Sequence, residues 1–551
     1  MASPFTTRFG TNYCPTDEEI VAIQSLIIGP SLRVHALDDE IAALHQKLDA
    51  LKEERDGVIA YVESHKALLS PVRRLPLDIV QEIFVTCLPD RNCVMSATEA
   101  PMLLGRICSS WRAISLSTPR IWSKLHIVEP QDPHHRTEQT KWAQRLASTE
   151  QWLARSGTCA LSISVESVAG DSDATMLHLF THILIPLASR WRAVHFSIPF
   201  PTVQLLSNLT EKDVPLLQDI SIFQHPAYHD DTPESVSPFD MHIFRGLGIT
   251  RASFVWPTVN LAAALPLRWT QLTVLHLLPS MSYAPDYPVL TGTAARDILS
   301  RCLALRICSI HVCDEVDLAL PTRDTIECPY LHTLELYNSH PGELAFTMRQ
   351  LFTGLSLPRL LRVRLAGYGR TPTNTHHLSP FLVSAPRLES LRIFSYYLTQ
   401  DMLVTLLRGL PTLRRLHLEC SDSLQDKFLD FLTPTADSDY CCPNLKEFVA
   451  WDCSISDAAL LRFINTKMTS GFGDRLELVE GNFRRVLQLD LRAELQPYVN
   501  AGLLLRLKYP DPMPVPPRES FPPWQGLERS PWAVDPLARF AQTGVDVVNC
   551  I

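Results

Sequence analysis

Four residues with metal-binding side chains lie close together in the sequence, namely Cys302, Cys308, His311 and Cys313. Thiolate and imidazole groups are the usual ligands of structural zinc, and four of them complete a tetrahedral site. Cys308, however, falls where an apolar strand residue is expected to be buried. Because side chains alternate along a strand, His311 then points to the opposite face of the sheet. We therefore predict that these side chains do not converge and that the protein holds no metal or other cofactor.

The sequence also lacks the patterns of common catalytic sites. It has no Gly-x-Ser-x-Gly turn for a nucleophilic serine and no glycine-rich loop of the type that binds nucleotide phosphates. Its 19 histidines cluster only at 134–135 and 376–377, and neither pair is accompanied by a recognisable nucleophile. We therefore predict a protein that is not an enzyme, and a hydrolase hidden in the repeats described below is the weakest of the alternatives.

The composition fits a folded protein with several structural units. Of the 551 residues, 46% are hydrophobic and 20% are charged, and the net charge of −9 argues against a general nucleic-acid-binding protein, which carries a basic surface. The N-terminus lacks a secretory signal pattern, and the longest apolar runs are too short to cross a bilayer. The 14 cysteines are scattered, as is usual for reduced thiols. We expect a cytoplasmic or nuclear protein without a membrane partner.

A repeated unit, Pro-x-Leu-x-x-Leu-x-Leu, occupies most of the chain. The first leucines of its clearest copies are Leu331, Leu360, Leu388 and Leu413. Weaker copies begin at Trp191, Leu217, Ile249, Leu272, Leu305 and Leu445. Apolar residues at the first, fourth and sixth positions bury one face of a short strand, and stacked units build a parallel sheet with helices outside. The pattern predicts an α/β leucine-rich-repeat solenoid over 158–509, after a connecting helical segment at 128–157 and before a proline-rich tail at 510–551.

The residues between the buried positions are expected to form an exposed, concave face of this sheet. Aromatic and arginine side chains are the types that most often anchor protein interfaces. We predict that a protein substrate binds to Glu335, Tyr337, Arg364, Arg392, Phe394, His417 and Trp451. The alternatives are an ordinary surface and a face covered by the tail.

The N-terminal residues predict helices. Thr16-x-x-Glu19 is a capping box for a short helix within 1–30, which should end near Gly29-Pro30. A second helix over 31–70 has apolar residues at alternating spacings of four and three, typical of a coiled coil. The seam positions are Leu37, Ile41, Leu44, Leu48, Leu51, Arg55, Val58, Val62, His65 and Leu69, of which only Arg55 and His65 are not apolar. Self-association is one interpretation, and a lone helix that folds back on the next domain is the other.

Residues 71–127 contain three motifs in order. The first is Leu75-Pro-x-Asp-Ile-x-x-x-Ile-Phe84, the second is Ile107-Cys-x-x-Trp-Arg112, and the third is Pro119-x-Ile-Trp122. Their order resembles the F-box family, particularly the F-box-like proteins abundant in fungi, although the link at 87–101 is long for that pattern. The resemblance implies a small all-α module that binds the Skp-type adaptor of a cullin–RING ubiquitin ligase. It assigns adaptor contacts to Leu75, Pro76, Ile79, Ile83, Phe84, Leu104, Ile107, Cys108 and Trp111.

The residues themselves are consistent with this interpretation. Ile79, Ile83 and Phe84 share one helix face, and a three-helix module is too small to bury all of its apolar residues by itself. We therefore expect the substrate-recognition subunit of a Skp–cullin–F-box ubiquitin ligase, with an unidentified protein substrate. The main alternative is an interaction scaffold that has lost adaptor binding, and another is a helical subdomain that only packs on the repeats.

Overall fold

The computed structural model describes most of the chain outside the long connections between strands. The chain divides into two compact units, Met1–Ile83 and Phe84–Ile551. The described residues are 3–69, 71–129, 138–167, 173–224, 241–256, 265–279, 290–313, 325–338, 351, 354–367, 385–395, 399–419, 424–433, 441–471 and 473–510. Of the predicted tail at 510–551, residues 511–551 lie outside them.

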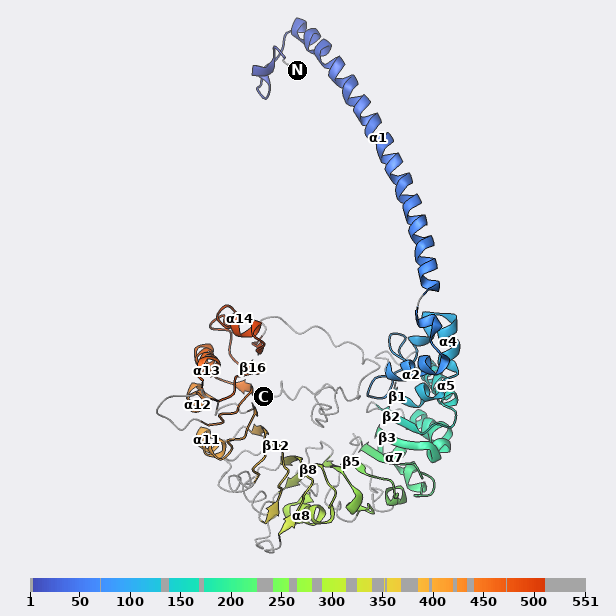
Figure 1. Ribbon diagram of the computed structural model, residues 1–551, viewed down its shortest axis with the longest axis vertical. Coiled ribbons are helices and arrows are strands. Elements are labelled where there is room, and N and C mark those ends of the chain that lie inside the picture. The colour runs from blue at the N-terminus through green and yellow to red at the C-terminus, as the bar shows by residue number, and fades with distance from the viewer. Residues whose placement is uncertain are drawn as a thin grey trace. The chain divides into compact units, whose positions relative to one another are not determined.

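One long helix, α1 (Asp17–Leu68), dominates the N-terminal unit (Figure 1). It begins at the predicted capping box, in which the Thr16 hydroxyl accepts the Glu19 N–H and the Glu19 carboxylate accepts the Thr16 N–H at 2.9 Å. The predicted break near Pro30 is wrong, because the helix continues through it. Gly29 has no Cβ, which removes one of the clashes that a proline makes with the preceding residue. The short helix predicted within 1–30 and the helix predicted over 31–70 are therefore one continuous helix.

The apolar seam predicted on α1 faces solvent within its own unit. Leu37, Leu44, Leu48 and Leu51 are all exposed, and Leu44 retains 60% of its surface. By length and composition alone, the helical stretch that begins at Asp17 also meets the criterion for a membrane span. Signal sequences and buried core helices meet the same criterion, so it is weak evidence for a membrane.

A large parallel sheet forms the second unit (Figure 1). On its main path each strand pairs with the next such strand in sequence order. These strands are β1 (Lys124–Val128), β2 (Leu161–Glu166), β3 (Trp191–Ile198), β4 (Asp219–Gln224), β5 (Arg251–Trp256), β6 (Val274–Pro279), β8 (Ile307–Cys313), β10 (Thr333–Asn338), β12 (Arg362–Gly367), β13 (Ser390–Ser395), β14 (Arg415–Glu419), β15 (Glu447–Cys453), β16 (Leu478–Phe483) and β17 (Leu504–Lys508). Off this path, β7 (Leu290–Thr291) pairs with β8, and β9 (Ile326–Glu327) pairs with β11 (Leu355–Ser356).

Helices lie along one face of this sheet (Figure 1). Several start at side-chain caps, in which the hydroxyls of Thr291, Thr399 and Ser456 accept a backbone N–H three residues further on. The described α-helices that follow β1 are α5 (Glu138–Arg155), α6 (Asp173–His178), α7 (Phe200–Leu205), α8 (Gly292–Arg301), α11 (Gln400–Arg408), α12 (Asp426–Leu432), α13 (Asp457–Thr469) and α14 (Arg492–Asn500).

The core follows the sequence repeat. In β13, Leu391 and Ile393 are buried, and Arg392 between them points to the opposite face, which we call the inner face. The first apolar position of every predicted repeat is buried as well: Trp191, Leu217, Ile249, Leu272, Leu305, Leu331, Leu360, Leu388, Leu413 and Leu445. The prediction of an α/β protein with a long helix before a parallel sheet is confirmed.

The predicted F-box-like module contains α2 (Leu77–Thr86), α3 (Leu104–Ile107), α4 (Ser109–Leu116) and a 3₁₀ turn, η3 (Pro119–Trp122). Its long link is attached to the sheet: the carbonyl of Cys93 accepts the His126 N–H at 2.8 Å, and the Asn92 amide bonds to Ser162 and Ser164. Strand β1, most of which falls within the predicted 71–127 domain, pairs with β2 in the sheet.

A buried carboxylate secures the other end of the sheet. Asp457 accepts hydrogen bonds from the Arg485 guanidinium at 2.6 and 3.0 Å and from the Tyr509 hydroxyl at 2.7 Å. The backbone N–H groups of Gln488 and Leu489 donate to it as well. Burial alone would raise the pKa of Asp457, but these donors outweigh it and lower the pKa to about 2. The network ties α13 to the segments that follow β16 and β17.

Candidate partner-binding surfaces

Helix α2 has two neighbouring apolar rows that differ in exposure. Ile79 and Ile83 are 45% and 37% exposed, and Leu77 is exposed as well. Val80 and Phe84 are buried. Since residues four apart share a helix face, one row packs inside the chain while the adjacent row faces solvent. An exposed apolar row on a small module is typical of a binding surface.

The segment that contains α3 and α4 also exposes large apolar side chains. These are Met102, Leu103, Ile107 and Leu116. The segment is held internally: Cys108 Sγ accepts the Trp111 N–H at 3.4 Å to begin α4, and the Trp111 ring packs on Phe84 with ring centroids 4.9 Å apart. The indole N–H of Trp122 donates to the Ser115 carbonyl at 2.7 Å. The internal contacts leave the aliphatic residues named above at the surface.

Two residues that the F-box resemblance assigns to the adaptor are buried, which corrects that assignment. Phe84 has no exposed surface and Leu104 almost none. A buried side chain cannot contact a partner unless its surroundings open, so both residues support the surface from below. The other assigned residues are exposed or half-buried: Leu75, Pro76, Ile79, Ile83, Ile107, Cys108 and Trp111.

No protein-family model matches this sequence, and no curated protein matches it. The F-box resemblance therefore rests on three ordered motifs and on the helices that contain them.

The predicted substrate residues do lie on one face. Strand register pairs Glu335 with Arg364, Arg364 with Arg392, and Arg392 with His417. Two residues further along each strand, Tyr337 pairs with Ala366, and Glu419 pairs with Trp451. Residues two apart in a strand point to the same face. The repeat pattern therefore places all of these side chains on the inner face.

The inner face is less exposed than predicted. Tyr337 and Arg364 are buried, and Arg392, Phe394, His417 and Trp451 are only partly exposed. Strands about 4.8 Å apart bring large side chains into contact. One result is an apolar cluster of Phe223, Val255, Leu278, Tyr337 and Ala366, against which Phe394 packs. The sequence repeat did not single out Phe223 or Val255, because their copies of the unit are weak.

Aromatic rings and hydrogen bonds hold the polar residues of this face. The guanidinium of Arg364 lies 5.3 Å from the Tyr337 ring centroid, and that of Arg392 lies 5.7 Å from the Trp451 centroid. The Tyr337 hydroxyl donates to Glu335 at 3.2 Å. Burial, together with the charges of Arg392 and Arg364, lowers the pKa of His417 to about 3, so this imidazole is neutral at neutral pH.

Three of the four candidate metal ligands, Cys302, Cys308 and His311, have described side chains. Cys302 and Cys308 are buried, and burial raises the pKa of the Cys302 thiol to about 12, which disfavours the thiolate that would bind zinc. The Cys313 side chain lies outside the described part of the chain. Within that part, no three His, Cys, Asp or Glu residues are placed to hold a metal ion.

Proposed function

We propose that this chain is the substrate-recognition subunit of a Skp–cullin–F-box type ubiquitin ligase and that it performs no covalent chemistry itself. Residues 71–127 would bind the adaptor, and the sheet, as a leucine-rich-repeat solenoid, would bind the substrate protein. The observation that carries the proposal is the solvent-exposed row of Ile79 and Ile83 on the helix of the first F-box-like motif. Neighbouring exposed aliphatic side chains on a small module are a common feature of protein-binding surfaces.

The mechanism follows from tethering. A chain that holds a substrate on its sheet and a ligase core on its N-terminal module keeps substrate lysines near the ubiquitin-charged enzyme. The reaction then depends on an effective concentration set by the connection between the two surfaces. The link at 87–101 supports such a connection, because Asn92 and Cys93 attach it to β1 and β2.

A pull-down with the Skp-type adaptor and cullin tests the proposal. The wild-type chain should be retained, and Ile79→Asp/Ile83→Asp should lose retention because charges replace an apolar contact surface. Substituting Phe84 would not be informative, since its buried side chain would disturb the fold. The matched control is Leu216→Asp/Leu247→Asp, which introduces the same charges at exposed leucines near the sheet and should be retained normally.

The alternative is a leucine-rich-repeat interaction scaffold that has lost adaptor binding. It predicts that the folded wild-type chain and both variants all fail to retain the adaptor. Equal retention of all three proteins would also contradict a role for the α2 row.

A further inference from the structure

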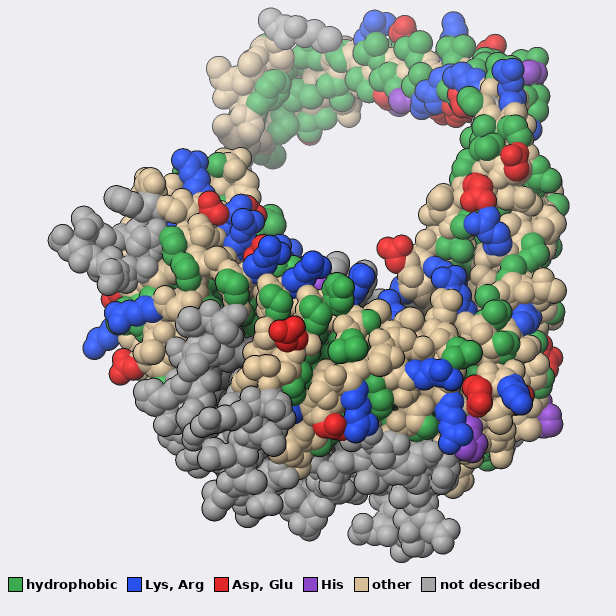
Figure 2. All heavy atoms as spheres, turned by 60° about the horizontal axis from the view of Figure 1, so that its bottom comes forward, with side chains coloured by type: hydrophobic (Ala, Val, Ile, Leu, Met, Phe, Trp, Pro, Cys, Tyr) green, Lys and Arg blue, Asp and Glu red, His purple; other side chains and the backbone are tan. Residues whose placement is uncertain are grey.

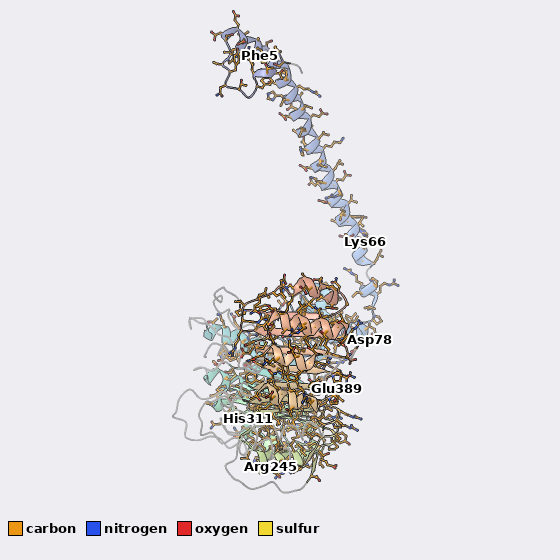
Figure 3. The ribbon with its side chains drawn as sticks, turned by 90° about the vertical axis from the view of Figure 1, so that its left-hand side faces the viewer. Phe5, Lys66, Asp78, Arg245, His311 and Glu389 are labelled. Atoms are coloured by element: carbon orange, nitrogen blue, oxygen red, sulfur yellow. The ribbon has the colours of Figure 1, made fainter. Side chains whose placement is uncertain are left out.

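Basic side chains gather along one edge of the sheet, at the strand ends that come first in the sequence. Arg306 and Arg414 directly precede β8 and β14, and Arg359 and Arg387 occupy the turns that precede β12 and β13. All four are exposed. We call these four residues the arginine rim. Figure 2 shows Lys and Arg side chains following one another along an edge of the sheet, and Figure 3 places Glu389 at this edge and His311 toward the opposite one.

The backbone ladder fixes the spacing of the rim. His332 N–H donates to the Arg306 carbonyl at 2.9 Å, and Arg414 N–H donates to the Glu389 carbonyl at 2.8 Å. Four strand steps separate Arg306 from Arg414 on the path β8-β10-β12-β13-β14. At about 4.8 Å per step the rim is roughly 19 Å long. An extended peptide of about six residues covers that length.

The rim differs in ion pairing from other basic side chains at the same edge of the sheet. Arg251 pairs with Asp219 at 3.2 Å, and Arg415 pairs with Glu447 at 2.8 Å. Lys446 pairs with Glu477 at 2.7 Å. By contrast, none of the four rim arginines forms an ion pair with any described residue of the chain. Among the described residues, Glu389 lies within the rim, and Glu477 lies close enough to Arg414 for that arginine to lower its pKa. The four arginines still give the rim an excess of positive charge in a protein whose net charge is −9.

Two features show that Arg306 and Arg359 act at one place. The pKa of His332, between Arg306 and Arg362 on the ladder, is lowered first by burial and then by Arg306, Arg362 and Arg359. Beside it the exposed ring of Tyr330 lies under the Arg359 guanidinium, 5.5 Å from its centroid. Tyrosine next to arginine provides an apolar contact beside the charges, as protein interfaces use.

We propose that the arginine rim is a docking site for an acidic, extended segment of a partner protein. Charge complementarity identifies the partner chemistry: glutamate or aspartate side chains, spaced along about six residues, would each reach an arginine that has no carboxylate of its own. A protein segment fits better than a nucleic acid, because Glu389 interrupts the rim and the overall negative charge repels a long polyanion. The site is separate from the inner face and does not depend on adaptor binding.

Fluorescence anisotropy on the full chain tests this site with a labelled peptide of about six glutamates and a lysine peptide of equal length. The wild type should bind the glutamate peptide alone, and more weakly as salt is raised. Arg387→Glu/Arg414→Glu should weaken binding about tenfold or more. Arg387→Gln/Arg414→Gln removes the charges without reversing them and should weaken peptide binding less. This variant replaces the glutamate variant if the latter does not fold. The control Arg192→Glu/Arg408→Glu makes the same charge change at exposed arginines outside the rim and should bind like the wild type.

Three outcomes overturn the proposal: no binding of the glutamate peptide by the wild type, equal weakening by the rim and control variants, or preferential binding of a single-stranded RNA oligonucleotide at the rim. Adaptor retention is measured on the same variants and should not change. A chain that binds the peptide through the rim but retains no adaptor would therefore contradict the ligase proposal and leave the docking site standing.

Discussion

The two units of this protein use the same aliphatic residues in opposite ways. Leu44 on α1 keeps 60% of its surface, whereas Leu391 on β13 keeps none. Both lie in regular sequence patterns, one with heptad spacing and the other with strand alternation. The difference lies in the neighbours. Each strand of the sheet meets the strand of the next repeat, whereas the seam of α1 remains exposed within the described part of Met1–Ile83. A regular apolar pattern thus predicts burial, but not whether the burial is within one chain.

The largest effect is expected where the packed unit buries a charge. Asp457→Ala should reduce the free energy of unfolding by about 3–5 kcal/mol, because it leaves the Arg485 guanidinium without its buried partner. Chemical denaturation measures the change. A loss below about 1 kcal/mol would show that the network does not secure the end of the sheet.

The same carboxylate predicts a pH dependence. Its folded pKa of about 2 lies below the ordinary value of 3.8, so its contribution to stability is complete above pH 4 and is lost as pH falls toward 2. The wild type should therefore lose more stability than Asp457→Asn over this range. Parallel slopes for the two proteins would contradict the assignment.

Leu391→Ala tests the comparison directly. It should cost about 2–5 kcal/mol in unfolding free energy, because it opens a cavity between stacked strands. The matched change Leu44→Ala, on the exposed seam, should cost less than about 0.5 kcal/mol. Thermal and denaturant unfolding measure both changes. Equal losses of unfolding free energy in the two variants would show that the seam is buried in solution and would contradict the comparison.

His417 provides a smaller, pH-dependent test within the packed unit. Its pKa is lowered from 6.5 to about 3, so the unfolded chain binds its proton first as the pH falls. Stability should decline from pH 6.5 toward 3, and His417→Gln should remove this part of the slope. An NMR titration that gave the imidazole an ordinary pKa would contradict the burial of this ring.

The exposed seam should affect association and leave stability nearly unchanged. Leu44→Asp/Leu48→Asp is expected to shift unfolding by less than about 0.5 kcal/mol and to abolish self-association through α1. Light scattering over a range of concentrations measures the second effect. A wild-type chain that is monomeric at every concentration would remove the coiled-coil hypothesis.

Much of the fold could be predicted from local pattern. The strand register followed from the period-two alternation around Leu391, and the start of α1 followed from Thr16 and Glu19. The break predicted at Pro30 is wrong because α1 continues through it, and the missing Cβ of Gly29 removes one part of the cost of the proline. The inner-face residues were assigned to the right side of the sheet, but their partial burial depends on side chains from strands that are neighbours only in space.

The sequence by itself determined the alternation of each strand, the α/β class and the apolar rows of α1 and α2, because these depend on residues within one or two helical turns. Only the tertiary structure decided that Ile79 is exposed while the adjacent Val80 is buried. It also brought Tyr509 to Asp457 across 52 residues and aligned four arginines from separate repeats. Burial and charge pairing depend on which segments become neighbours, and a local pattern does not specify those neighbours.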